Sequence, residues 1–134
     1  MIIRQAVPLL RVADVARSIQ WYHETLGFVG DPFPASPPYA FAILRNGPAE
    51  LMLRRGSPPA RSNPRQYDWD VYLRLEGGDF REMFAQFSTR HIVTRRLERM
   101  FYGLAEFEIA DPDGNVICLS QLLEDASDLP TPTV

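Results

Sequence analysis

Lysine is absent from this sequence of 134 residues: all fourteen basic side chains are arginine, against seventeen acidic ones, for a formal net charge of −3. A mildly acidic chain without a long basic run is a poor candidate for binding the phosphate backbone of nucleic acid. Apolar runs are also too short to cross a bilayer. We therefore expect neither nucleic acid nor a membrane as a partner.

Cysteine is nearly as scarce, with Cys118 as the single example. One thiol excludes an intrachain disulfide and is compatible with a reducing compartment. The first residues, Met1 to Gln5, do not have the basic start and long apolar core of a signal peptide. These two absences predict a cytoplasmic protein.

Proline is plentiful, and its twelve residues cluster between segments that have a regular apolar pattern. Residues 5–12 favour a strand, Asp14 is a helix N-cap, and residues 15–26 have helical spacing up to Gly27. Further strands are predicted at residues 28–29, 39–45 and 50–54, with a hairpin turn at Asn46-Gly47. The first half of the chain therefore has the order βαβββ.

The same order returns after a proline-containing linker at residues 56–66. A strand at 70–75 precedes a helix capped by Asp79, whose apolar face starts at Phe80. The remaining strands are predicted at 92–97, 104–110 and 116–122, with a tight turn at 111–115. Residues 124–134 are polar and contain proline, which indicates a loose tail.

This repetition defines the predicted fold. Asp14 and Asp79, like Gly47 and Gly114, are separated by roughly 65 residues, as expected for an internal repeat. We expect an α+β protein in which two tandem βαβββ modules form a curved mixed sheet with helices outside. Residues 1–123 would form a single domain, with module one at about 5–55, the linker at 56–66, module two at about 67–122, and a polar tail at 124–134. The concave side between the modules would suit a small ligand.

Short motifs in both halves carry a family resemblance. Residues 7–15 read Val-Pro-Leu-Leu-Arg-Val-Ala-Asp-Val, and Trp-Tyr at 21–22 and Leu-Gly-Phe at 26–28 follow. In the second half, Tyr102-Gly103 and Phe107 precede the turn Asp-Pro-Asp-Gly-Asn at 111–115. With these motifs the chain resembles the glyoxalase/bleomycin resistance protein/dioxygenase (vicinal oxygen chelate) superfamily over about residues 5–122.

The resemblance implies where a metal would bind. Enzymes of this superfamily hold a divalent ion with one side chain from the first and last strand of each module, typically His, Gln or Glu. Those positions fall here on Val7, Met52, Asp70 and Cys118. A catalytic site needs at least three good ligands and an open position. We therefore predict no metal and no cofactor, as in the bleomycin-resistance branch, whose members sequester a drug in grooves of a homodimer.

Three classes of function follow from the resemblance. The first is a homodimeric binding protein that holds an amphipathic or aromatic ligand, such as an antibiotic, in a concave groove. Its predicted ligand-binding residues are Val7, Met52, Trp69, Asp70, Tyr72, Tyr102, Glu106 and Cys118. The second is a metal-dependent lyase, isomerase or ring-cleaving dioxygenase with an atypical site built from Asp70, Glu50 and Glu106. The third is an accessory domain, against which the lack of any attached domain argues mildly.

Two acidic residues, Glu106 and Glu108, alternate with Phe107 and Ile109. If the apolar pair faces a helix, both carboxylates face the cleft. They would then either attract a cationic, planar ligand or pair across the sheet with one of several arginines. Those arginines are Arg74, Arg95, Arg96 and Arg99. Both interpretations of Glu106 and Glu108 stay open.

Cys118 is more suited to packing as a small apolar side chain than to nucleophilic attack.

Overall fold

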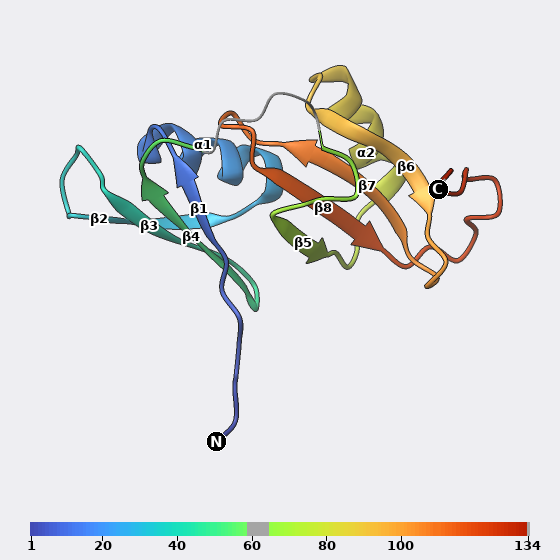
Figure 1. Ribbon diagram of the computed structural model, residues 1–134, viewed down its shortest axis with the longest axis horizontal. Coiled ribbons are helices and arrows are strands. Elements are labelled where there is room, and N and C mark those ends of the chain that lie inside the picture. The colour runs from blue at the N-terminus through green and yellow to red at the C-terminus, as the bar shows by residue number, and fades with distance from the viewer. Residues whose placement is uncertain (59–64, 134) are drawn as a thin grey trace. The chain divides into compact units, whose positions relative to one another are not determined.

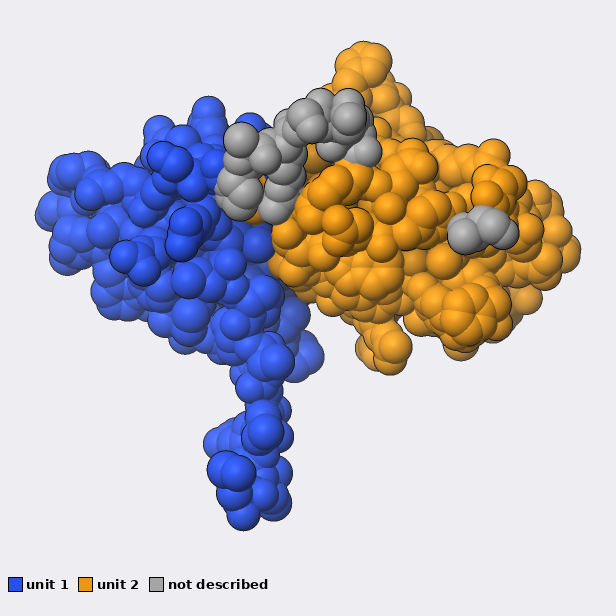
Figure 2. Space-filling view, in the orientation of Figure 1, with its two compact units in different colours: residues 1–60, 112–114 blue, residues 61–111, 115–134 orange. Residues whose placement is uncertain are grey.

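The computed structural model describes residues 1–58 and 65–133. Within them the order is β1-α1-β2-β3-β4 followed by β5-α2-β6-β7-β8, so the predicted βαβββ repeat is confirmed (Figure 1). The chain divides into two compact units (Figure 2). Unit 1 contains residues 1–60 with 112–114, and unit 2 contains residues 61–111 with 115–134.

Unit 1 is a four-stranded sheet with one helix. Its elements are β1 (Leu9–Val12), α1 (Val15–Leu26), β2 (Val29–Phe33), β3 (Phe41–Asn46) and β4 (Ala49–Arg55). The strand order is β1-β4-β3-β2, with β1 parallel to β4 and the other pairs antiparallel. The predicted hairpin at Asn46-Gly47 joins β3 to β4. Pro8 lies just before β1, so the sheet loses no hydrogen bond to it.

Local signals fix the ends of α1. The Asp14 side chain accepts a hydrogen bond from the Arg17 backbone N–H at 3.1 Å, which satisfies a free donor of the first turn. Gly27 ends the helix with φ of 71°, a left-handed conformation that glycine adopts without steric cost. The helix covers the sheet face that carries buried Leu44, Leu51 and Leu53.

Unit 2 repeats this plan. Its elements are β5 (Val71–Arg74), α2 (Phe80–Thr89), β6 (Val93–Arg99), β7 (Ala105–Ala110) and β8 (Val116–Gln121). The strand order is β5-β8-β7-β6, again with a parallel first pair. Asp79 caps α2 by accepting from the Glu82 backbone N–H at 3.0 Å. The described chain thus forms two four-stranded mixed sheets, and the α+β class is confirmed.

The core of unit 2 is built around Phe107 on β7. Its ring centroid lies 5.0 Å from that of Phe80, 5.2 Å from Phe84 and 6.2 Å from Phe87, all on α2. Aromatic rings at these separations stabilise a core beyond the area they bury. Phe107 therefore faces the helix, and its neighbours Glu106 and Glu108 face the other side of the sheet.

Residues after β8 are held against unit 2 rather than forming a loose tail. The Arg81 guanidinium donates to both carboxylate oxygens of Asp128, at 3.0 and 2.9 Å, and to the Asp125 carbonyl at 2.7 Å. The Arg99 backbone N–H donates to the Pro130 carbonyl at 2.8 Å. Of the predicted linker at 56–66, residues 59–64 lie outside the described residues. Neither described helix is long and apolar enough to cross a membrane.

Candidate functional site

The sheet face of unit 2 that is turned away from α2 carries polar and aromatic side chains from all four strands. One row across the sheet consists of Tyr72, Cys118, Glu108 and Arg95. The neighbouring row consists of Arg74, Ser120, Glu106 and Glu98. Strand register therefore brings together ionisable groups that are far apart in the sequence.

Arg95 lies at the centre of this face and is 2 % exposed. Its Nε donates to Glu108 Oε2 at 2.5 Å, its Nη1 to Glu98 Oε1 at 3.0 Å, and its Nη2 to Glu106 Oε1 at 3.0 Å. The guanidinium also lies 4.3 Å from the centroid of the Tyr67 ring. A buried cation is tolerated only when it is paired and hydrogen-bonded, and these contacts meet that condition.

Hydroxyl and thiol groups complete the cluster. Glu106 Oε2 accepts hydrogen bonds from the Tyr72 hydroxyl at 2.7 Å and from the Tyr102 hydroxyl, and its Oε1 accepts from Cys118 Sγ at 3.4 Å. The Tyr67 hydroxyl donates to Glu98 Oε1 at 2.6 Å. We call this set the Arg95 network: Arg95, Glu98, Glu106, Glu108, Tyr67, Tyr72, Tyr102 and Cys118.

The protonation states of the network follow from burial and from these contacts. Burial alone would lower the pKa of Arg95, but hydrogen bonds to Glu108 and Glu106 outweigh it and raise that pKa, so the side chain is a permanent cation. Burial would raise the pKa of Glu98, yet hydrogen bonds from Tyr67 and Arg95 lower it. Glu98 is therefore ionised at neutral pH.

The hydroxyl and thiol donors of the network are neutral. Burial, reinforced by Glu106, raises the pKa of the Cys118 thiol well above its usual range. Burial and the same carboxylate raise the pKa of the Tyr102 hydroxyl. A thiol with a raised pKa is a poor nucleophile, so the packing role expected for Cys118 is supported over a catalytic one.

The predicted site residues divide between the two units. Val7 and Met52 belong to unit 1, where the Met52 backbone N–H donates to the carbonyl of Pro8 at 2.9 Å. The other six belong to unit 2, and four of these are members of the Arg95 network: Tyr72, Tyr102, Glu106 and Cys118.

Trp69 and Asp70 lie beside the network at the start of β5. The Trp69 ring centroid is 5.2 Å from that of Tyr72. Asp70 Oδ2 accepts from Arg65 Nη2 at 2.7 Å and from the Val116 backbone N–H at 2.8 Å. Asp70 thus ties the segment before β5 to the start of β8.

Sequence reasoning did not select four members of the network as site residues: Tyr67, Arg95, Glu98 and Glu108. Arg95 was considered as a pairing partner for the β7 carboxylates, and the structure shows that pairing for both Glu106 and Glu108. Glu98 is three residues from Arg95, so strict alternation places the two on opposite faces. The β6–β7 register shifts between them, and this irregularity turns both side chains to one face.

The two interpretations of Glu106 and Glu108 now separate. Both side chains are fully buried, and both are paired with Arg95. They do not form an exposed acidic surface, so attraction of a cationic ligand by these two carboxylates is not supported. The arginine-rich run at residues 95–99 was the sequence feature that could have indicated this pairing. Which carboxylates these arginines meet depends on pairing between different strands.

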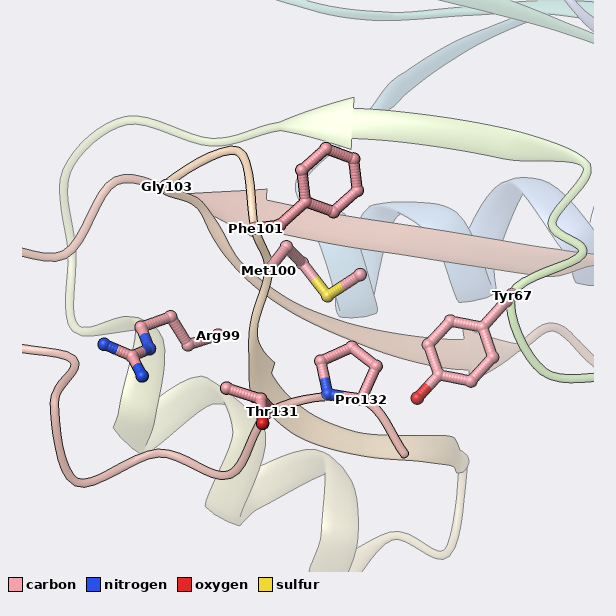
Figure 3. Close-up of a pocket in the computed structure, with 7 residues that line it drawn as sticks. All are labelled: Tyr67, Arg99, Met100, Phe101, Gly103, Thr131 and Pro132. Carbon is pink, nitrogen blue, oxygen red and sulfur yellow. The ribbon is translucent and has the colours of Figure 1, made fainter. Parts of the chain in front are cut away.

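A hollow of about 750 Å³ opens next to the network (Figure 3). Its described lining residues are Tyr67, Arg99, Met100, Phe101, Gly103, Thr131 and Pro132. Tyr67 is shared with the network, and Figure 3 shows it across the hollow from Arg99. Phe101 is 96 % exposed. A volume of this size is within the range that holds small organic ligands.

A family model for the glyoxalase/bleomycin resistance protein/dioxygenase superfamily matches residues 3–119. The chain belongs to this superfamily. No curated protein matches the chain significantly. The match to the family model confirms the resemblance seen in the sequence motifs.

Several solved structures share the fold. A bleomycin-binding protein in complex with bleomycin is 26 % identical, with a TM-score of 0.61, covering 90 % of this chain and 100 % of that one. The bleomycin resistance determinant encoded on transposon Tn5 is 24 % identical, with a TM-score of 0.60 and coverage of 90 % and 98 %. TioX from Micromonospora sp. ML1 is 21 % identical, with a TM-score of 0.67 and coverage of 92 % and 100 %.

The residues at the superfamily's metal positions do not fit a divalent ion. Val7 has no donor atom, and the Met52 thioether is a poor ligand for a hard cation. Asp70 is already paired with Arg65, and the raised pKa of Cys118 keeps its sulfur protonated. Within residues 1–58 and 65–133, no group of three or more His, Cys, Asp or Glu side chains is arranged to hold a metal.

Proposed function

We propose that this chain is a metal-free binding protein that holds a small aromatic or amphipathic molecule, such as an antibiotic, without changing it. The observation that carries the proposal is the identity of the four side chains at the superfamily's metal positions, which are Val7, Met52, Asp70 and Cys118. None of these offers a free anionic or imidazole ligand. We therefore expect apolar and aromatic contacts, rather than a metal ion, to hold the ligand.

The rim of the Arg95 network supports an aromatic ligand. Trp69 and Tyr72 are partly exposed and in ring contact, and Tyr102 is 43 % exposed. Hydrogen bonds from the Tyr72 and Tyr102 hydroxyls to Glu106 hold these two rings in fixed positions. Aromatic rings fixed in this way bind flat ligands at a low cost in conformational entropy. The predicted binding residues Glu106 and Cys118 would then act indirectly. Glu106 accepts the hydrogen bonds that position Tyr72 and Tyr102, and Cys118 donates to Glu106.

We also propose that the protein works as a cytoplasmic homodimer. On the helix-free face of unit 1, Leu9 is 50 % exposed, Phe33 44 % and Val29 65 %. Apolar side chains gathered on one exposed face are typical of surfaces that a partner covers. Met52 lies on β4 of the same sheet and Val7 lies two residues before β1, and both would contribute to a groove shared by two copies.

Thermal unfolding in the presence of candidate ligands tests this proposal. The panel contains bleomycin, other aromatic antibiotics, aromatic metabolites, and the chlorides of zinc, nickel and manganese. A specific ligand at one hundred times its Kd stabilises the folded state by about 2.7 kcal/mol, whereas the metals should give no stabilisation. Stoichiometric metal in protein purified without chelator would overturn the proposal.

A matched pair of tryptophan variants locates the site. Trp69→Phe, on the rim, should weaken ligand binding. Trp21→Phe, on α1 with its ring 4.8 Å from that of Tyr22, should leave binding unchanged. Equal loss of binding in both variants would contradict the placement of the ligand on the rim.

A further inference from the structure

Four apolar side chains from three separate parts of unit 2 face one space. Figure 3 shows the rings of Tyr67, Phe101 and Pro132 and the thioether of Met100 around the hollow of about 750 Å³. Tyr67 precedes β5, Met100 and Phe101 follow β6, and Pro132 comes after β8. Aromatic rings and a thioether make favourable contacts with flat, carbon-rich groups.

Tyr67 is a fixed wall of this hollow. Its backbone N–H donates to Glu108 Oε2 at 3.1 Å and its hydroxyl donates to Glu98 Oε1 at 2.6 Å. The centroid of its ring lies 4.3 Å from the Arg95 guanidinium. These contacts hold Tyr67 at a φ of 61°, a left-handed conformation that costs free energy for a residue other than glycine.

Backbone hydrogen bonds hold the other two walls. The Gly103 N–H donates to the Met100 carbonyl at 3.1 Å and closes the turn that carries Phe101. The Arg99 N–H donates to the Pro130 carbonyl at 2.8 Å and fixes the segment after β8 to the end of β6. A site whose walls are already in place loses little conformational entropy when a ligand binds.

No charged group among the described walls points into the hollow. Arg99 pairs in register with Ala105, which lies on the same face of β7 as Phe107, so the Arg99 side chain belongs to the helix side of the sheet. Figure 3 shows its guanidinium pointing away from Tyr67. Glu98, which accepts from Tyr67, is 2 % exposed. An ionised ligand group would therefore lose hydration here without gaining a partner of opposite charge.

We infer that this hollow binds an uncharged aromatic group, meaning a flat ring system without an ionised substituent. The inference rests on the proposed small-molecule binding. It adds to that function an apolar site whose described lining does not include the rim residues Trp69, Tyr72 and Tyr102. The bound ring would contact Tyr67 and would cover Phe101, which is 96 % exposed.

Isothermal titration of the full chain with matched probes tests the ligand class. The probes are neutral 1-naphthylmethanol, 1-naphthylacetate and 1-naphthylmethylammonium, which share one ring system. The neutral probe should bind most tightly, and the anion and the cation should each bind about five-fold more weakly because neither finds a counter-charge. Added sodium chloride should not weaken binding of the neutral probe.

A pair of exposed apolar residues in unit 2 locates the binding. Phe101→Ser should weaken the neutral probe about ten-fold, because the ring loses its apolar cover. The variant should keep its melting temperature, since Phe101 is almost fully exposed. Leu122→Ser removes another exposed apolar side chain, 71 % exposed and not among the described lining residues, and should leave the affinity unchanged.

The outcomes separate this inference from the proposed function. An ion that binds more tightly than the neutral probe, or a Phe101→Ser variant with unchanged affinity, would overturn the inference and leave the proposed function intact. The same holds if the neutral probe does not bind while a member of the antibiotic and metabolite panel stabilises the protein. If neither the probes nor the panel bind, both fail.

Discussion

The two units share one topology but differ in the chemistry of the sheet face that no helix covers. In unit 1 the central row across the strands consists of Leu9, Met52, Ile43 and Asp31. In unit 2 the matching row consists of Tyr72, Cys118, Glu108 and Arg95. The first row is apolar except at its edge, and the second is the middle of a buried ionic network.

This difference shows which part of the repeat is constrained. The helix-facing sides are alike, since both hold buried leucine, isoleucine, valine or phenylalanine side chains against an amphipathic helix. Those residues are required for the module to fold. The other face is free to vary, and in unit 2 it carries the buried arginine and carboxylates of the Arg95 network, which stabilise one another. Function is therefore best sought on the helix-free faces.

The largest expected effect comes from removing the buried cation at the centre of the Arg95 network in unit 2. Arg95→Met would leave the buried Glu106 and Glu108 without their cation and Glu98 with Arg96 alone, and should lower the free energy of unfolding by about 3–5 kcal/mol, measured by urea denaturation. Asp31→Asn, at the matching edge position of unit 1, should cost less than about 0.5 kcal/mol because Asp31 is exposed.

A combined variant sharpens this result. Glu98→Gln, Glu106→Gln and Glu108→Gln added to Arg95→Met should recover part of the lost stability, since no unpaired charge then remains buried. If Arg95→Met alone is as stable as the unmodified chain, the network does not have the energetic role that distinguishes unit 2 from unit 1.

A smaller effect is expected at Tyr72, which corresponds to Leu9 of unit 1. Tyr72→Phe removes one hydrogen bond to a buried carboxylate and should cost about 1.5–3 kcal/mol in chemical denaturation. Leu9→Ala should cost less, because Leu9 is half exposed. A larger loss for Leu9→Ala would indicate that the face of unit 1 is covered in solution, as the proposed homodimer requires.

The smallest effect concerns acid. The pKa of Glu98 is lowered in the folded state, so its contribution to stability is complete above its ordinary pKa of 4.5 and is lost as pH falls through the lower, folded value. Urea denaturation between pH 7 and pH 3 should show a steeper loss of stability for the unmodified chain than for Glu98→Gln. Tyr67→Phe should give an intermediate slope, and identical slopes for all three proteins would contradict the assignment.

Local sequence signals specified most of the fold. Asp14 and Asp79 fixed the helix starts, Gly27 ended α1, and Asn46-Gly47 set the hairpin between β3 and β4. These features depend on hydrogen bonds within a few residues, so one chain segment contains all the information. Alternation along β7 likewise predicted that Glu106 and Glu108 lie opposite Phe107.

Only the tertiary structure decided what those two carboxylates meet. The partner cation, Arg95, and the third carboxylate, Glu98, depend on a shifted register between β6 and β7 that breaks the period of two. The hold of Arg81 on residues after β8, and the hollow that Thr131 and Pro132 help to wall, join segments more than forty residues apart. The reason is physical: periodicity determines the direction of a side chain within its own strand, whereas register and packing between distant segments determine its neighbours.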